Sequence, residues 1–148
     1  MIETEVHTMS IIAAVREPDL KLSYARARLA EVERMRQVYL ASLDGMAQRD
    51  IAKAVHLSQA SVHRMILRAK ALDLAQETLE EIALQRLVGQ ISTDEMVERL
   101  RSYDKWVPRV IDPVDGVLGE DSQAELEELL DDGLLSEAEV DLVLDARQ

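Results

Sequence analysis

The side chains best suited to bind a ligand lie in residues 58–68. As a helix, this stretch has one apolar face, because three residues recur at helical spacing: Val62, Met65 and Ile66. The remaining surface carries small or hydrogen-bonding side chains and then cations: Ser58, Gln59, Ala60, Ser61, His63, Arg64 and Arg68. Residues 51–72 contain no Asp or Glu. Such side chains can hydrogen-bond to base edges in the DNA major groove, and the cations can pair with phosphates.

Two short helices joined by a tight turn are expected to position these side chains. The first helix has its own apolar face, formed by Ile51, Ala52 and Val55. In the turn that follows, Leu57 can fill the space between the helices. Ser58 can cap the second helix by accepting a hydrogen bond from a backbone N–H of its first turn.

This arrangement resembles the helix-turn-helix of bacterial and phage repressors, antitoxins and sigma-type regulators. The resemblance covers about a seventh of the chain and rests on Gln48-x-x-Ile51-Ala52-x-x-Val55-x-Leu57-Ser58-x-x-Ser61-Val62-x-Arg64. His56 replaces the Gly that usually takes a left-handed backbone there, and Ala47 replaces the usual Ser or Thr cap. The resemblance implies these DNA-binding residues: Ser58, Gln59, Ala60, Ser61, His63, Arg64, Arg68, Gln48 and Arg49. The alternative interpretation is an ordinary helical hairpin with an apolar seam.

Composition predicts an all-α protein. The 148 residues include only three prolines and five glycines, and Ala, Leu, Glu and Arg are abundant. Because the chain has no Cys, it contains no disulfide, thiolate metal ligand or cysteine nucleophile. No apolar run approaches membrane-spanning length, and the N-terminus does not resemble a signal peptide. We therefore expect a cytoplasmic, nucleoid-associated protein without a membrane partner.

Charge is unevenly distributed along the chain. Residues 1–75 contain 11 Lys and Arg against 9 Asp and Glu, whereas residues 76–148 contain 6 against 20. Basic charge thus collects around the predicted helix-turn-helix, while DNA would repel the acidic half. This asymmetry indicates two functions on one chain.

We divide the chain into three parts. Residues 1–22 form an N-terminal arm, in which Pro18 interrupts an apolar patch. Residues 23–75 form an N-terminal helix-turn-helix domain, supported by a helix that runs to about Leu43 and ends at Gly45. Residues 76–148 form acidic helical hairpins for partner binding or oligomerisation. Their first helix, residues 77–88, is either a dimerisation element or part of the core.

A repeated turn predicts the acidic hairpins. In residues 89–96 and 133–140, a Gly ends one helix and a Ser caps the next, with Glu three residues after the Ser. These reciprocal capping boxes pair Ser92 with Glu95 and Ser136 with Glu139, and Ser122 with Glu125 forms a third. The predicted helices span residues 93–102, 122–132 and 137–147.

The connection between the hairpins, residues 103–121, is predicted to be a loop of unusual length. It contains the only Trp of the chain and several apolar residues. Trp106 either packs across the hairpins or anchors a partner. We assign four residues of this loop to partner binding: Tyr103, Trp106, Val107 and Arg109.

No residues are arranged for catalysis, so we do not expect an enzyme or a cofactor. The histidines are scattered, without a second metal ligand at suitable spacing. The carboxylates of residues 120–132 lie on a predicted helix, without the alternating ligands of a calcium loop. They form a solvated face or complement a basic protein.

Together these features resemble the antitoxins of bacterial toxin–antitoxin pairs. In this interpretation a homodimer represses its own operon by binding operator DNA, and the acidic half neutralises a toxin. Two alternatives remain. One is a DNA-recognition adaptor similar to a phage small terminase subunit, which would form a large ring. The other is a plain dimeric repressor.

Overall fold

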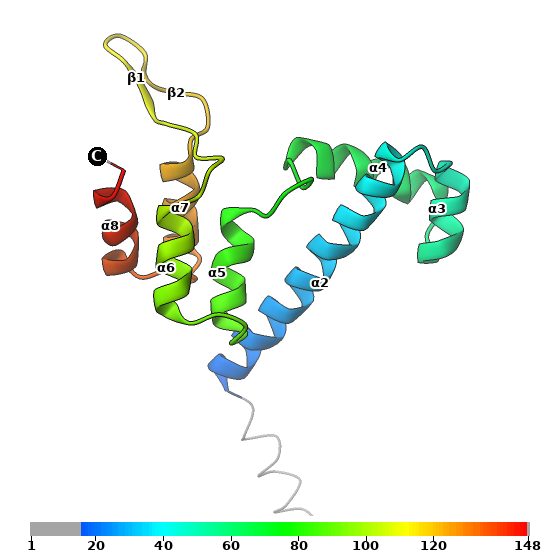
Figure 1. The fold of residues 1–148 in the computed structure, drawn as a ribbon, viewed down its shortest axis with the longest axis horizontal. Helices are drawn as coiled ribbons and strands as arrows, with labels where there is room; N and C mark the ends of the chain where they lie inside the picture. The colour runs from blue at the N-terminus through cyan, green and yellow to red at the C-terminus, as the bar shows by residue number, and fades with distance from the viewer. Residues whose placement is uncertain (1–15, 148) are drawn as a thin grey trace, which may run out of the picture.

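A computed structural model describes residues 16–147, which form seven α-helices and one two-stranded sheet (Figure 1). The N-terminal helices are α2 (Glu17–Leu43), α3 (Gln48–Val55) and α4 (Gln59–Ala71). The C-terminal helices are α5 (Leu79–Leu87), α6 (Thr93–Arg101), α7 (Ser122–Asp131) and α8 (Glu137–Asp145). The described part is therefore mostly helical, as predicted. Within it, no helix combines the length and apolar character needed to cross a lipid bilayer.

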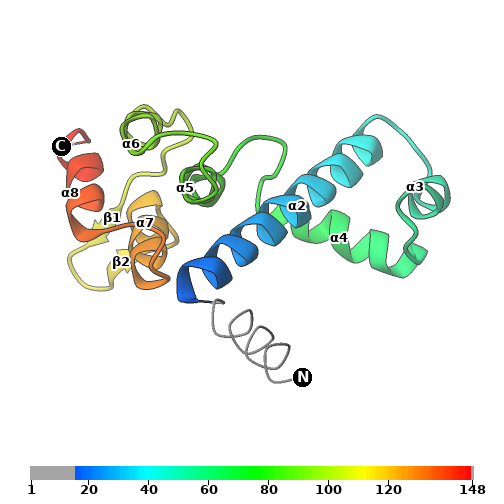
Figure 2. The same cartoon turned by 90° about the horizontal axis from the view of Figure 1, so that it is seen from below.

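Helix α2 runs between two groups of helices and packs against both (Figures 1 and 2). Near its C-terminal end, Val38 lies in a core with residues of α3 and α4. In its middle, Val32 and Met35 pack on Ala69 and Leu74. Nearer its N-terminus, Ala25 lies in the large core formed by α5–α8. Since α2 contributes to all three cores, it does not belong to one part of the chain alone.

Helix α2 begins six residues before the predicted start at Ser23. Pro18 lies in its first turn, where a missing backbone N–H is not needed for an intrahelical hydrogen bond. The carboxylate of Asp19 accepts a hydrogen bond from the backbone N–H of Arg16 at 3.1 Å, which closes that turn. Residues 17–22 therefore extend the helix. The apolar patch that we predicted before Pro18, residues 10–15, lies outside the described residues.

The helix caps of the C-terminal half agree only in part with the predicted capping boxes. Ser136 and Glu139 form the complete box. Ser92 caps α6, but only its own half of the box is formed. The third prediction is wrong, because Asp121 caps α7 by accepting from the backbone N–H of Ala124 at 2.7 Å. A box that sequence analysis did not identify, Thr78 with Glu81, begins α5.

The predicted loop at residues 103–121 contains a β-hairpin, which corrects that prediction. Strands β1 (Val110–Asp112) and β2 (Gly116–Leu118) are antiparallel, with Val110 opposite Leu118. The Asp112 carboxylate accepts hydrogen bonds from the backbone N–H groups of Val114 and Asp115, which stabilises the turn. Gly116 then takes the left-handed backbone that ends such three-residue turns.

Candidate nucleic-acid interface

The turn between α3 and α4 has the backbone geometry that the sequence predicted. His56 adopts a left-handed conformation, with φ 58° and ψ 41°, and ends α3. The hydroxyl of Ser58 then accepts a hydrogen bond from the backbone N–H of Ser61 at 3.1 Å and caps α4. Ala47 precedes α3 but does not cap it, because the Ala side chain cannot form a hydrogen bond. Residues of the turn itself, His56 and Ser58, therefore determine where α3 ends and where α4 begins.

Helix α4 separates its apolar face from the predicted DNA-binding residues. Val62 and Ala69 are fully buried against α2 and α3. On the other side, the exposed predicted residues are Ser58, Gln59, Ala60, His63, Arg64 and Arg68, and Ser61 is half-buried. From α3, Arg49 is exposed, and the Nε2 atom of Gln48 lies 3.4 Å from Nδ1 of His63. All nine residues thus lie on α3, on α4 or in the turn between them.

A short chain of hydrogen bonds orients Arg64. Its Nη2 atom donates to the Ser61 hydroxyl at 3.2 Å, and that hydroxyl also accepts from Ser58 at 2.9 Å. The guanidinium group is therefore held toward the N-terminal end of α4. Because arginine has five N–H donors, most remain free for another acceptor.

Three residues of this surface were not identified by sequence analysis: Lys53, Leu67 and Lys70. All are exposed, and 54% of Leu67 is accessible. Leu67 lies three positions after Arg64 and seven after Ala60, so the three share one helical face. This helical spacing was the sequence signal from which Leu67 could have been assigned to the surface. An apolar side chain at this position can contact a thymine methyl group.

The cations around α4 differ from many of the other cations in their ion pairs. Arg28 and Arg36 of α2 pair with carboxylates of α5. Arg86, Arg99 and Arg109 pair with carboxylates within the C-terminal half. Among residues 16–147, Lys53, Arg64, Arg68 and Lys70 form no ion pair, as is also true of Arg26, Arg34 and Arg101. Arg49 lies 3.9 Å from the carboxylate of its neighbour Asp50. The cations around α4 are therefore available to phosphates, whereas the C-terminal half uses most of its cations internally.

The N-terminal part of α4 lies away from the acidic helices, whereas its last residue, Ala71, faces α7 across a cavity. Of the described elements, only α2 and α3 contact α4. Helices α6–α8 lie near the opposite end of α2 (Figures 1 and 2). With 27 residues, α2 is about 40 Å long. Since charges at physiological salt are screened over about 8 Å, the acidic half has little effect on the potential at the N-terminal part of α4.

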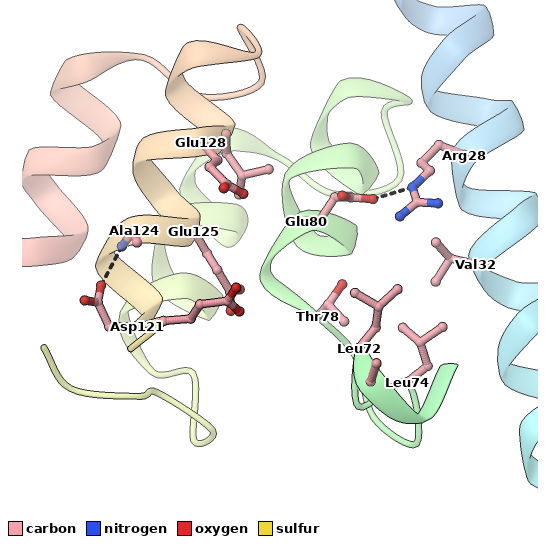
Figure 3. A pocket seen from close by; sticks show the side chains of 13 residues that line it. Arg28, Val32, Leu72, Leu74, Thr78, Glu80, Asp121, Ala124, Glu125 and Glu128 are labelled. Carbon is pink, nitrogen blue, oxygen red and sulfur yellow. Dashed lines mark hydrogen bonds and ion pairs between the residues drawn. The ribbon is translucent and has the colours of Figure 1, made fainter. Parts of the chain in front are cut away.

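A cavity of about 410 Å³ lies between α7 and the helices α2, α4 and α5 (Figure 3). Five carboxylates line it, together with Arg28: Glu80, Glu120, Asp121, Glu125 and Glu128. Burial raises the pKa of Glu125, and repulsion from the neighbouring carboxylates raises it further. Among residues 16–147, no three acidic or histidine side chains are placed to hold a metal ion. The cavity is acidic rather than a purely apolar ligand pocket.

The four predicted partner-binding residues have contacts within the chain. The Tyr103 hydroxyl donates to the Glu77 carbonyl at 2.9 Å. Trp106 packs on the C-terminal core, with the guanidinium carbon of Arg147 4.5 Å from its ring centre. Arg109 pairs with a carboxylate, and the side chain of Val107 is exposed. These contacts give three of the four a structural role, and partner binding at them stays a prediction.

No family model, curated protein or solved structure matches this chain. The functional assignment therefore depends on the residues and geometry described above.

Proposed function

We propose that the protein is a helix-turn-helix transcription regulator that binds double-stranded DNA by placing α4 in the major groove. The main support is the outer face of α4, which is exposed and not covered by any other described element. That face combines hydrogen-bonding side chains with cations that form no ion pair among residues 16–147.

The side chains of α4 divide into two roles along the helix. Gln59, Ser61 and Arg64 lie in its N-terminal half, the part of a recognition helix that contacts base edges. A well-placed bidentate contact from such a side chain is worth about 1–3 kcal/mol of discrimination between bases. Arg68 and Lys70 lie further along α4 and are assigned to phosphates, which contribute affinity without sequence information.

For the acidic half we propose binding of a basic partner protein, as in an antitoxin that neutralises a toxin. Residues 76–148 carry 20 Asp and Glu against 6 Lys and Arg. Most of this half lies away from the N-terminal part of α4, so a partner bound there leaves that part of the DNA-binding surface uncovered (Figure 1). An acidic surface also attracts a basic protein and speeds its association.

The proposal is tested by selecting bound duplexes from a random DNA library with the full-length protein. We expect enrichment of one motif, arranged as an inverted repeat with half-sites about 10 base pairs apart if a dimer binds. Light scattering on the same sample gives the oligomeric state. Failure to enrich any motif, even at low salt, would contradict the proposal. A large ring that binds DNA would instead favour the packaging adaptor.

A further inference from the structure

We propose that the β-ribbon, residues 110–118, is the docking site for an extended, basic segment of a partner protein, which pairs with it as an additional strand. This inference rests on the proposed partner-binding role of residues 76–148 and names the surface involved. It also moves the predicted partner site from residues 103–109 to the strands that follow them.

The β-ribbon is not packed against the rest of the described fold. Its two strands contact each other and no helix, and the ribbon projects away from α7 and α8 (Figure 1). Each strand has one neighbour, so each also has one open edge. Open edges present unpaired backbone N–H and C=O groups, and a lone two-stranded sheet is only marginally stable. An added strand would satisfy one of these edges.

Both faces of the β-ribbon carry an exposed apolar pair, and Asp112 shares the face of Val110. Ile111 and Val117 lie opposite each other on one face, and 70% of Ile111 is accessible. Val110 and Leu118 form the corresponding pair on the other face, and both are exposed. Val114 at the turn is 90% accessible. Exposed edge strands usually carry Lys or other charges that prevent pairing. The β-ribbon contains no Lys or Arg, and its two charges are both negative, Asp112 at the end of β1 and Asp115 in the turn.

Contacts with the start of α7 hold the base of the β-ribbon in place. The backbone N–H of Ser122 donates to the Val107 carbonyl at 3.0 Å. In return, the backbone N–H of Val107 donates to the Ser122 hydroxyl at 2.7 Å. The guanidinium of Arg109 pairs at 3.1 Å with Asp121, which is buried. A surface held in its binding conformation loses less entropy when a partner binds.

The negative charge around the β-ribbon favours a basic partner segment over a second copy of this chain. Residues 110–146 contain 13 Asp and Glu and no Lys or Arg. A second copy would bring two surfaces of this kind together and would be repelled. Beyond β2, Glu120 leads into the acidic cavity, where Glu125 and Glu128 also lie (Figure 3). A strand flanked by Lys or Arg would place its cations beside these carboxylates.

The test uses a phage-displayed library of random 12-residue peptides, selected against the immobilised full-length protein. Three proteins are compared: wild type, the double variant Ile111→Thr/Val117→Thr, and the control Leu142→Thr. Leu142 is an exposed apolar residue on α8, and Thr keeps strand propensity in the β-ribbon. We expect wild type and control to enrich peptides that alternate apolar and polar residues and carry Lys or Arg. A synthetic peptide with an enriched sequence should bind the double variant at least tenfold more weakly than it binds wild type.

Three results would contradict the proposed docking site. Absence of enrichment, or equal affinity of the peptide for wild type and double variant, would overturn the docking site. So would a wild-type dimer that dissociates in the double variant, because the β-ribbon would then bind a second copy. Circular dichroism checks the fold, and Val114→Glu at the exposed turn provides a second variant that keeps both strand pairs.

DNA affinity is measured on the same preparations. We expect all variants to bind DNA as wild type does, because the β-ribbon lies away from α4 (Figure 1). If the wild-type protein does not bind DNA, the regulator proposal is contradicted, but the peptide result remains valid. Normal DNA binding with no effect of the variants on peptide affinity would overturn only the docking site.

Discussion

Arg36 of α2 and Glu81 of α5 form a bidentate ion pair between the two halves of the chain. Nη1 of Arg36 donates to Oε2 of Glu81 at 3.0 Å, and Nη2 donates to Oε1. Arg36 also donates to the backbone carbonyls of Leu74 and Gln76, which precede α5. These contacts fix how α2, the connection and α5 are joined. The hydrogen bonds to Glu81 raise the pKa of Arg36, so the pair stays charged on the arginine side.

Replacing Arg36 by Met is expected to lower the free energy of unfolding by about 3 kcal/mol. The substitution leaves the Glu81 carboxylate, whose residue is only 5% exposed, without its cation. Urea denaturation of the full-length protein measures the loss. The matched control is Arg34→Met, on an exposed part of the same helix, with an expected change below about 0.5 kcal/mol. Equal effects of the two substitutions would show that the ion pair is not important for stability.

His56→Gly is expected to stabilise the protein by about 0.5–1 kcal/mol. The left-handed backbone at His56 costs a residue with a Cβ atom about 1 kcal/mol, and Gly avoids this cost. The control is His63→Gly within α4, which should destabilise by about 0.3–0.5 kcal/mol because Gly is a poorer helix former than His. Thermal denaturation distinguishes the two. A destabilised His56→Gly variant would mean that the turn does not have this conformation in solution.

Glu139 is expected to make the protein sensitive to acid. Burial opposes its ionisation, but the hydrogen bonds from Arg86 and from the Ser136 backbone outweigh burial and lower its pKa. A lowered folded pKa gives stability above the ordinary value near 4.5, and this stability is lost as pH falls through the folded value. Glu139→Gln should therefore be less stable at pH 7 and have a flatter stability profile below pH 5. Parallel profiles of melting temperature against pH would contradict this role.

Glu125 is expected to affect the pH dependence of stability in the opposite direction to Glu139. Its raised pKa means that its stabilising effect is present below the unfolded value and is lost as pH rises through the folded value. Glu125→Gln should therefore raise stability at pH 7, by about 0.5 kcal/mol or less because the side chain is partly exposed, and change little at pH 4. The control is Glu98→Gln, an exposed carboxylate on α6. A loss of stability at pH 7 would show that Glu125 is not repelled by its neighbours.

Sequence patterns predicted those features that depend on neighbouring residues. The Ser58 cap, the left-handed His56 and the helix end at Gly45 are local, and the structure contains each of them. The β-ribbon also had a local signal, because Asp112-Pro113-x-Asp115-Gly116 lies between β-branched and aliphatic residues. The predicted loop at residues 103–121 did not take this turn signal into account.

Features that depend on distant residues could not be predicted in this way. Ser122 was expected to cap α7, but its hydroxyl accepts from Val107, 15 residues earlier, and the cap passes to Asp121. The Arg36–Glu81 pair joins residues 45 apart. Helical periodicity shows that α2 has an apolar face, but not that Ala25 and Val38 pack into different cores. Dividing the chain after residue 75 would therefore remove contacts on which α2 depends.

The most direct test of DNA recognition by α4 is the affinity of Arg64→Ala for a DNA site selected by the wild-type protein. The control is Arg101→Ala, which removes the same charge from an exposed position at the end of α6. Fluorescence anisotropy with the full-length proteins should show about tenfold to hundredfold weaker binding for Arg64→Ala, corresponding to a base contact of about 1–3 kcal/mol. Arg101→Ala should bind as wild type does. If both variants bind the site with wild-type affinity, α4 does not read DNA through Arg64 and the account is contradicted.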